Sequence, residues 1–310
     1  MSKIAFMGAG STVFAKNVLG DVMCTPALRE SHLALYDIDS QRLDDSRMML
    51  ETINRNINEN RATITAHLGV PSRREALRGA DFVVNAIQVG GYEPATVIDF
   101  EIPNKYGLRQ TIADTLGIGG IMRALRTIPV VLDFAADMEA VCPDAWFLNY
   151  VNPMAMVTAG LLRGSRIKAV GLCHSVQGCA QELLRTAGLA DEVTRLQWKV
   201  AGINHQGWLL EVADGGKDLY PEIKRRVAAA WEEIRRRGGA ARVIQELRDS
   251  GDPNWRKNTL ARVSHDLVRL RLMLELGCYV TESSEHNAEY APWFIKKARI
   301  HPRYRARMKS

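Results

Sequence analysis

The sequence predicts an α/β fold, with a doubly wound, mostly parallel sheet in residues 1–195 and a second α+β domain in residues 196–310. Three observations support this prediction. Short apolar runs alternate with helical patterns, polar or glycine-rich motifs follow the ends of these runs, and after about residue 195 the pattern becomes polar and helix-rich. Such alternation builds a parallel sheet, because each strand returns to the next one through a helix.

The elements of the first domain follow from the apolar runs and from the helix-start and turn residues between them. The expected strands are Lys3–Met7, Leu33–Tyr36, Asp81–Ile87, Trp146–Asn149 and Lys168–Leu172. The expected helices are Thr12–Met23, Asp39–Asn60, one from about residue 120 to 140 and one after Pro153. Asp39 is a suitable helix cap, and the turn pair Gly90-Gly91 ends the third strand region. In the second domain, the charged run Glu232–Arg237 indicates a further helix.

Length and composition indicate an ordinary globular protein. A chain of 310 residues with 46% hydrophobic and 25% charged residues can bury a large core, and two domains are expected. No apolar run reaches about 18 residues, and the chain begins directly with a strand pattern, so we expect neither a membrane span nor a cleavable leader. The five cysteines are scattered, which suits a reducing compartment. We therefore expect a cytoplasmic protein.

The net charge of +6 is concentrated at the end of the chain. Residues 296–310 hold seven basic residues and no acidic one, so the rest of the chain carries −1. A basic run can bind polyanions, but a solvated and disordered end is the commoner structure. We expect a small-molecule ligand, and neither nucleic acid nor a membrane as a partner.

The segment Gly8-Ala-Gly10-Ser-Thr-Val13 indicates a Rossmann-like dinucleotide site. It follows the first strand and opens a helix, whose N-terminal amides can face a pyrophosphate, and Asp37 ends the second strand. A carboxylate there accepts hydrogen bonds from the adenosine ribose, which favours NAD over its phosphorylated form. The third glycine of the usual fingerprint is absent, and the alternative is a mere tight turn. The expected cofactor-binding residues are Gly8, Gly10, Ser11, Thr12, Val13, Asp37 and Asn85.

Two further motifs, Gly171-Leu-Cys-His-Ser-Val176 and Gly202-Ile-Asn-His-Gln206, carry a thiol and an imidazole. Cys173 and His205 could ligate a metal if the fold brings the two turns together, and two protein ligands would leave room for substrate oxygens. His174 could act as a general acid or base. The alternative for each residue is a packing or hydrogen-bonded structural role.

Five motifs together resemble successive signatures of the family 4 glycoside hydrolases, and within them most closely the bacterial α-galactosidases. They are Asp114–Pro129, Asn149-Tyr-Val-Asn-Pro-Met154, Gly171–Val176, Ala201-Gly-Ile-Asn-His205 and Thr281-Glu-Ser-Ser-Glu-His286. The resemblance runs in order from residue 1 to about residue 295. It implies hydrolysis of a glycoside with the help of NAD+ and a divalent metal, usually Mn2+.

The implied mechanism is an exception to the usual two-carboxylate scheme. NAD+ takes a hydride from C3 of the sugar, and the resulting ketone acidifies the proton at C2. The metal binds the oxygens at C2 and C3 and stabilises the enediolate. A base removes the C2 proton, the glycosidic oxygen leaves, water adds and the hydride returns, so that the net reaction is hydrolysis.

The resemblance also implies roles for individual residues. Cys173 and His205 become the metal ligands, and His174 stands where relatives keep the acid that protonates the leaving group. Asn152 and Asp114 are expected to contact the sugar.

The base is expected in the segment that includes Tyr279, Glu282, His286 and Tyr290. Glu282 is the favoured residue, with Tyr290 as the second choice.

The expected substrate class is inferred from the lack of an arginine after the glycine pair Gly90-Gly91. The branches of the family that cleave phosphosugars carry an arginine soon after the glycine pair, whereas this chain reads Gly90-Gly-Tyr-Glu-Pro-Ala95. An unphosphorylated α-galactoside such as melibiose is therefore expected. An α-glucuronidase, an α-galacturonidase or another glycosidase of the family is the alternative.

The family continues well beyond residue 310, so we expect the second domain to be incomplete at its C-terminal end, and a homo-oligomer where that part is present. Two alternatives from other classes stay open. One is an NAD-dependent 2-hydroxyacid dehydrogenase, which needs a His-Asp pair and no metal-binding cysteine. The other is an inactive NAD-binding fragment.

Overall fold

The computed structural model describes residues 1–112 and 117–295, and the chain forms two compact units. Unit 1 comprises Met1–Tyr106 and Ala113–Leu172, and unit 2 comprises Gly107–Ile112 and Cys173–Ser310. The basic run at residues 296–310 and the expected sugar-binding residue Asp114 lie outside the described residues.

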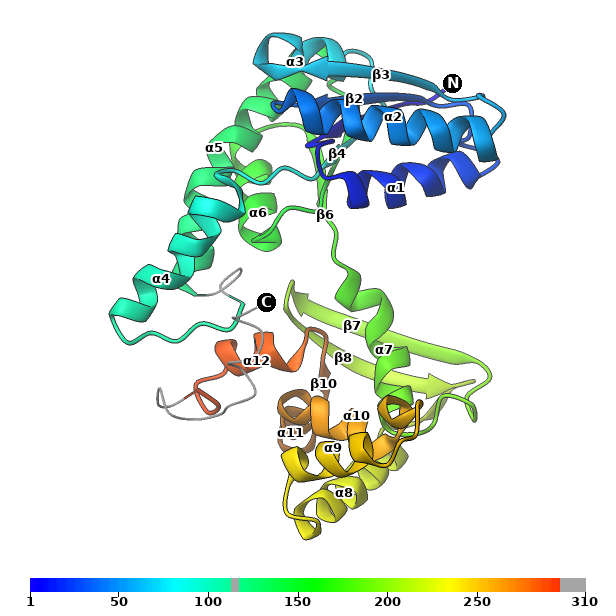
Figure 1. Cartoon of the computed structure of the whole chain (residues 1–310), viewed down its shortest axis with the longest axis vertical. Coiled ribbons are helices and arrows are strands. Elements are labelled where there is room, and N and C mark those ends of the chain that lie inside the picture. Colours follow the sequence, from blue (N-terminus) through cyan, green and yellow to red (C-terminus); the bar gives the residue numbers. More distant parts are fainter. Residues whose placement is uncertain (113–116, 296–310) are drawn as a thin grey trace. The chain divides into compact units, whose positions relative to one another are not determined.

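Unit 1 is built on a parallel sheet with the strand order β3-β2-β1-β4-β5-β6 (Figure 1). Its strands are β1 (Lys3–Met7), β2 (His32–Asp37), β3 (Thr63–Leu68), β4 (Phe82–Asn85), β5 (Trp146–Asn149) and β6 (Lys168–Gly171). The order reverses between β1 and β4, which is the point where doubly wound sheets bind ligands beyond their carboxyl ends. The predicted Rossmann-like fold class is confirmed.

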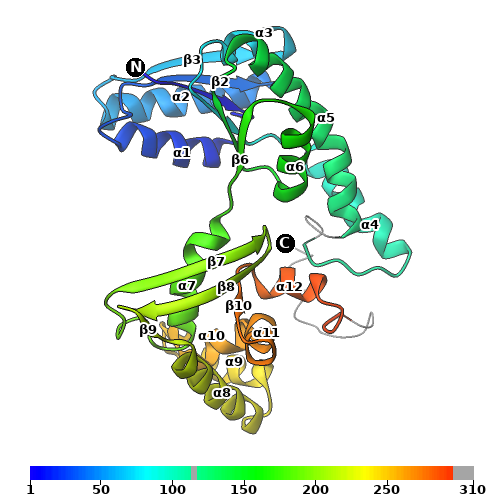
Figure 2. The same cartoon turned by 180° about the vertical axis from the view of Figure 1, so that it is seen from behind.

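Helices cover both faces of this sheet (Figure 2). They are α1 (Thr12–Cys24), α2 (Ser40–Ile57), α3 (Gly69–Leu77), α5 (Ile118–Val141) and α6 (Met154–Gly164). A further helix, α4 (Val97–Lys105), follows the irregular turn η1 (Gly91–Thr96) and packs against α5. Alternate residues of β1 face opposite ways: Ile4 and Phe6 pack in a core with α1 and α2, and Ala5 and Met7 pack in another with α3, α5 and α6. This alternation is the period of a strand buried on both faces.

Most elements expected in unit 1 are present within a few residues of their expected ends. The Asp39 side chain caps α2 by accepting a hydrogen bond of 3.1 Å from the amide of Arg42. The third strand, Thr63–Leu68, was not expected from the sequence. It is an edge strand with no fully buried residue, so it lacks the apolar run that marks its neighbours.

Unit 2 contains a small antiparallel sheet in the order β10-β8-β7, with β9 paired to β8. Its strands are β7 (Leu196–Ile203), β8 (Gln206–Asp214), β9 (Lys217–Asp218) and β10 (Tyr279–Val280). Its helices are α7 (His174–Thr186), α8 (Tyr220–Arg236), α9 (Ala240–Asp249), α10 (Thr259–His265), α11 (Leu267–Leu276) and α12 (Ser284–Tyr290), with the short turn η2 (Trp255–Lys257). β7 and β8 are joined by Asn204 and His205 alone, because Ile203 pairs with Gln206. A connection of two residues fixes the register of the hairpin.

Helix α7 packs with the residues that follow it in the chain. Its apolar positions Cys179, Ala180, Leu183 and Leu184 are buried in the main core of unit 2. The units therefore part between Leu172 and Cys173. The boundary expected after residue 195 was placed where the residue pattern changes. That pattern does not reveal which domain covers the apolar face of an amphipathic helix.

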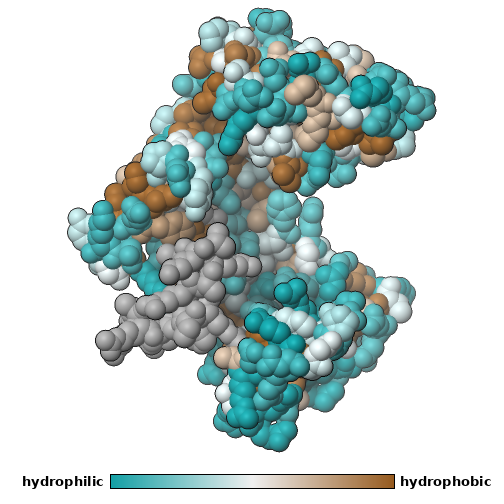
Figure 3. All heavy atoms as spheres, viewed as in Figure 1, coloured by the Kyte–Doolittle hydropathy of each residue, from teal (hydrophilic) through white to brown (hydrophobic). Residues whose placement is uncertain are grey.

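The surface of α8 and α9 is charged. The predicted helical run lies in α8, where Arg235 pairs with Glu232 and Arg236 with Glu233. Figure 3 shows mainly hydrophilic residues over these helices. Exposed pairs of this kind add little stability. Among residues 1–112 and 117–295, no helix is long and apolar enough to cross a membrane.

Candidate functional site

The glycine turn after β1 has the geometry of a dinucleotide cradle. Gly8 has φ +89°, and a Cβ added there would lie 2.8 Å from backbone atoms of Ala86 and Ile87. A Cβ on Gly10 would lie 2.8 Å from a carboxylate oxygen of Asp37. Only glycine fits either position without displacing its neighbours.

The start of α1 leaves donors for an anion. Ser11 is the N-cap residue, and its side chain makes no capping hydrogen bond. Thr12 and Val13 begin the helix, and the first amides of a helix have no acceptor within it. The first turn contains no acidic side chain that would compete with a phosphate. These features suit a pyrophosphate at the positive end of the helix dipole.

Asp37 lies beside this turn at the end of β2. One carboxylate oxygen accepts a hydrogen bond of 2.6 Å from the backbone amide of Gly10, and the other accepts one of 3.0 Å from the amide of Asp39. An ionised carboxylate offers about four acceptor positions. Asp37 therefore holds the turn closed and retains capacity for ribose hydroxyls.

Asn85, at the end of β4, is fully buried in a small amide network. Its Nδ2 donates to Oδ1 of Asn149 at 3.0 Å, and the same Asn149 oxygen accepts the amide of Val151 at 3.2 Å. This pairing leaves Oδ1 of Asn85 without a hydrogen-bond partner in the described part of the chain. A buried acceptor of this kind is satisfied by a bound group or a water. Asn152, in the loop after β5, accepts the amide of Met154 at 3.3 Å.

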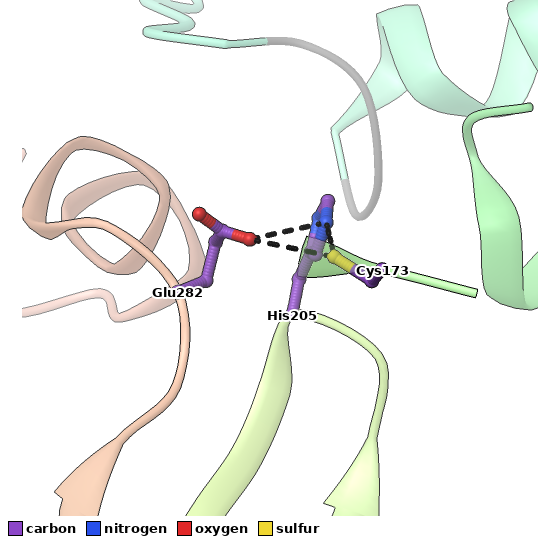
Figure 4. Close-up of side chains that lie close together, drawn as sticks. All are labelled: Cys173, His205 and Glu282. Atoms are coloured by element: carbon purple, nitrogen blue, oxygen red, sulfur yellow. Dashed lines mark hydrogen bonds and ion pairs between the residues drawn. The ribbon is translucent and has the colours of Figure 1, made fainter. Parts of the chain in front are cut away.

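In unit 2, three side chains from distant parts of the sequence converge (Figure 4). Cys173 precedes α7, His205 lies in the β7–β8 turn and Glu282 follows β10. Cys173 Sγ is 3.7 Å from His205 Nε2 and 3.9 Å from Glu282 Oε2, and the last two atoms are 3.3 Å apart. One potential ligand atom from each residue lies within 4.8 Å of the others. A soft sulfur, an imidazole and a carboxylate so close together can hold a divalent transition metal.

The thiol of Cys173 is activated by its surroundings. Burial raises its pKa, but hydrogen bonds with His205 and Ser175 outweigh burial and lower the pKa of Cys173 to about 7. Ser175 Oγ lies 3.2 Å from the sulfur. By contrast, burial raises the pKa of Cys142 and of Cys179 to about 11. Of these three thiols, only Cys173 is prepared to be the thiolate that binds a metal.

His205 is held in an unusual backbone conformation. It is buried and has φ +65°, in the left-handed region that costs a residue other than glycine about 1–2 kcal/mol. Strain of this kind is often retained where it aims a functional side chain. On the other side of the ring, Nδ1 lies 3.3 Å from the hydroxyl of Tyr290. The imidazole is thus fixed between the phenol and the cluster.

Other polar residues near this cluster were not singled out from the sequence. Ser175 contacts the sulfur, and Ser283 caps α12 and lies 2.8 Å from His286 Nδ1. Both amide atoms of Asn204 and the hydroxyl of Thr281 are buried without a hydrogen-bond partner in the described residues. Each precedes a member of the cluster, His205 and Glu282 respectively. Of these residues, only Ser175 could have been found from the sequence. It stands two positions after Cys173, in the first turn of a helix, where serine is common.

The remaining expected catalytic residue, His174, is the first residue of α7 and is exposed. Tyr279, which was weighed as a base, is fully buried, and its hydroxyl donates to the carboxylate of Asp266. Burial first, and then the Asp266 charge, raises the pKa of Tyr279 far above its usual value. This tyrosine is therefore a structural residue.

Comparisons with known proteins identify the family. Residues 3–189 match the description "Family 4 glycosyl hydrolase", and residues 200–309 match "Family 4 glycosyl hydrolase C-terminal domain". The chain belongs to the family 4 glycosyl hydrolases. The second match reaches residue 309, further than the end near residue 295 that the sequence motifs indicate.

Three curated relatives resemble the chain over nearly its whole length. An α-galactosidase of Bacillus subtilis (strain 168) is 53% identical over 297 residues, covering 96% of this chain and 61% of that protein. An α-galactosidase of Rhizobium meliloti (strain 1021) is 35% identical over 296 residues, covering 95% and 53%. An α-galacturonidase of Thermoanaerobacter italicus (strain DSM 9252 / Ab9) is 31% identical over 297 residues, covering 94% and 60%. The chain thus spans between half and two thirds of the length of these relatives.

Solved structures share the fold. The protein lplD from Bacillus subtilis has a TM-score of 0.76 at 24% identity, with 99% of this chain and 68% of that chain covered. A 6-phospho-α-glucosidase from gut microorganisms, solved in complex with NAD and Mn2+, has a TM-score of 0.69 at 21% identity, with 93% and 60% covered.

Proposed function

We propose that the chain is part of an α-galactosidase that hydrolyses unphosphorylated α-galactosides with the help of NAD+ and a divalent metal ion. Mn2+ is the metal that we favour. One observation carries the proposal: Cys173 and His205, 32 positions apart, meet with their ligand atoms 3.7 Å from each other. The relatives named α-galactosidase support the substrate class, at 53% and 35% identity.

The residues present fit both cofactors. For NAD+, Gly8 and Gly10 leave room that a Cβ would fill, and Asp37 offers acceptors beside them. For the metal, the sulfur of Cys173 and the imidazole of His205 are donors that suit a divalent transition ion. The fold neighbour solved with NAD and Mn2+ supports the same pair of cofactors.

Bound NAD+ and metal would supply a reversible hydride acceptor and a Lewis acid, which together make a C–H bond of the sugar acidic. Cys173 and His205 would hold the metal. His174, exposed beside Cys173, would protonate the departing oxygen. Asn152 and Asp114 would contact the sugar, and Asp114 lies outside the described residues.

Two side chains compete for the C2 proton. The carboxylate of Glu282 lies in the cluster, and the hydroxyl of Tyr290 lies on the far side of the His205 ring from it. Either group can accept a proton when ionised.

The substrate class rests on the segment Gly90–Ala95, which holds no arginine. A 6-phosphate usually needs such a bidentate partner. A uronide is the second candidate, since the α-galacturonidase of Thermoanaerobacter italicus is 31% identical to this chain.

The proposal is tested by measuring hydrolysis of aryl glycosides with and without NAD+, Mn2+ and thiol. The substrates are α- and β-galactosides, glucosides and galacturonides. Because hydride is borrowed and returned, we expect α-galactoside cleavage that needs NAD+ in catalytic amounts and accumulates no NADH. NADH formed in proportion to product would indicate a 2-hydroxyacid dehydrogenase instead. Cofactor binding without turnover would indicate an NAD-binding fragment.

Solvent isotope incorporation tests the elimination. If the C2 proton leaves before the glycosidic bond breaks, product formed in D2O carries deuterium at C2, and substrate deuterated at C2 reacts more slowly. Ordinary glycosidases leave that bond intact. Product with no deuterium at C2 would exclude the NAD-assisted route.

A further inference from the structure

Glu282, the favoured base, contacts both residues expected to bind the metal. Its Oε2 lies 3.3 Å from His205 Nε2 and 3.9 Å from Cys173 Sγ, and the three side chains point toward one another (Figure 4). Donor atoms that each lie about 2.0–2.3 Å from one divalent ion are separated from each other by about 3–4 Å. The observed separations match this requirement without any movement of the side chains.

The second oxygen of the carboxylate is held by its own segment. Oε1 accepts the amide of Ser283 at 2.9 Å and lies 3.6 Å from His286 Nδ1. These contacts orient the carboxylate so that Oε2 is directed to the sulfur and the imidazole. Metal-binding carboxylates are commonly oriented by hydrogen bonds of this kind to the other oxygen.

Burial adds an electrostatic reason. The side chain of Glu282 is 16% exposed and that of His205 is 3% exposed. Once the Cys173 sulfur is ionised, a thiolate and a carboxylate lie together away from water, and these like charges are stabilised by a positive charge between them. A divalent ion supplies that charge, and a protonated His205 would be the alternative source.

We propose that Glu282 is the third protein ligand of the metal site and not the base that removes the C2 proton. The inference rests on the proposed function for the presence of a metal. Three protein ligands leave up to three positions of an octahedral ion for oxygens of the sugar or water. Of the two expected bases, Tyr290 is then the one that remains.

The test measures metal affinity rather than turnover. The full chain, stripped of metal, is titrated with Mn2+ by calorimetry and by the electron paramagnetic resonance signal of free Mn2+, as wild type and as Glu282→Gln. We expect the substitution to weaken Mn2+ binding about 100-fold, because an amide oxygen is a poorer ligand than a carboxylate. Glu285→Gln is the matched control, since it removes one negative charge from the same short helix region outside the cluster, and its Mn2+ affinity should equal that of wild type.

Several outcomes overturn the assignment. Wild-type Mn2+ affinity in a folded Glu282→Gln variant would leave Glu282 as a base or an ion-pair partner. Glu282→Asp keeps the charge and shortens the side chain, so it serves if the first variant does not fold, and unchanged affinity in it would equally reject the ligand role.

Failure of the wider proposal looks different. If Cys173→Ser binds Mn2+ as tightly as wild type, or if wild type binds no Mn2+, the assignment of the metal site is wrong. The ligand role of Glu282 is then rejected as well. If Cys173→Ser loses Mn2+ and Glu282→Gln does not, only the role of Glu282 is wrong.

Discussion

The Nδ1 atom of His205 lies 3.3 Å from the hydroxyl oxygen of Tyr290, and the two rings are inclined by only 16°. For Nε2 to bind a metal, the proton of the neutral imidazole must reside on Nδ1. The hydroxyl oxygen of Tyr290 then accepts a hydrogen bond from the Nδ1–H group, and this bond fixes the tautomer. Outer partners of this kind orient metal-binding histidines in many sites.

Tyr290→Phe should therefore weaken Mn2+ binding by about 10-fold while leaving the fold intact. Calorimetric titration of metal-free protein measures the affinity, and circular dichroism checks the fold. Tyr106→Phe is the control, since Tyr106 is 80% exposed, and its affinity should match wild type. An unchanged affinity in Tyr290→Phe would mean that the phenol does not support the ligand.

Cys173 should be more reactive than the buried thiols Cys142 and Cys179. With a pKa of about 7, against about 11 for the other two, roughly half of Cys173 is thiolate at neutral pH. Alkylation of metal-free protein by iodoacetamide, followed by peptide mass spectrometry, should show a rate at Cys173 that rises through about pH 7 and then levels off. Mn2+ should protect this residue. Equal labelling of Cys179, or no protection by the metal, would contradict the prediction.

Gly8→Ala should abolish NAD+ binding and destabilise unit 1. The added Cβ would lie 2.8 Å from the backbone at Ala86 and Ile87, and the φ of +89° adds strain of about 1–3 kcal/mol. Gly20→Ala is the matched control, because nothing lies within 4 Å of a Cβ at that position in α1. There alanine should stabilise the helix by about 0.5–1 kcal/mol. Thermal denaturation and NAD+ titration measure both effects, and normal NAD+ affinity in Gly8→Ala would refute the cradle.

Asp137 should make unit 1 sensitive to acid. Burial raises its pKa, but hydrogen bonds from Arg74 and Arg73 outweigh burial and hold the pKa below its usual value. A depressed folded pKa contributes stability above the unfolded value of about 3.9, and that stability is lost as pH falls through the folded pKa.

Asp137→Asn should therefore lower the free energy of unfolding by about 1–3 kcal/mol at neutral pH. The difference from wild type should shrink below about pH 4. Urea unfolding followed across this pH range gives both values. Asp133→Asn, at an exposed position of the same helix, should show neither effect. A difference that persists in acid would show that the Asp137 charge is not responsible.

Much of unit 1 was predictable, because strands buried on both faces are continuous apolar runs and because glycine in a tight turn has few substitutes. The edge strand Thr63–Leu68 escaped prediction, since a half-exposed strand has no such run. In unit 2, the packing of α7 could not be predicted, because an amphipathic helix does not specify which neighbour covers its apolar face. Cys173 and His205 were expected as metal ligands, whereas the close approach of Glu282 to both of them was not.

The parallel sheet, the glycine cradle and the family resemblance follow from the amino-acid sequence, because local periodicity and short motifs specify strands, helices and turns. Which distant side chains meet depends on the tertiary fold. The two-residue turn of β7 and β8 aims His205, the pairing of β10 with β8 brings in Glu282, and the start of α7 presents Cys173. Contacts between residues about 30 and 110 positions apart depend on chain topology, which sequence spacing does not encode.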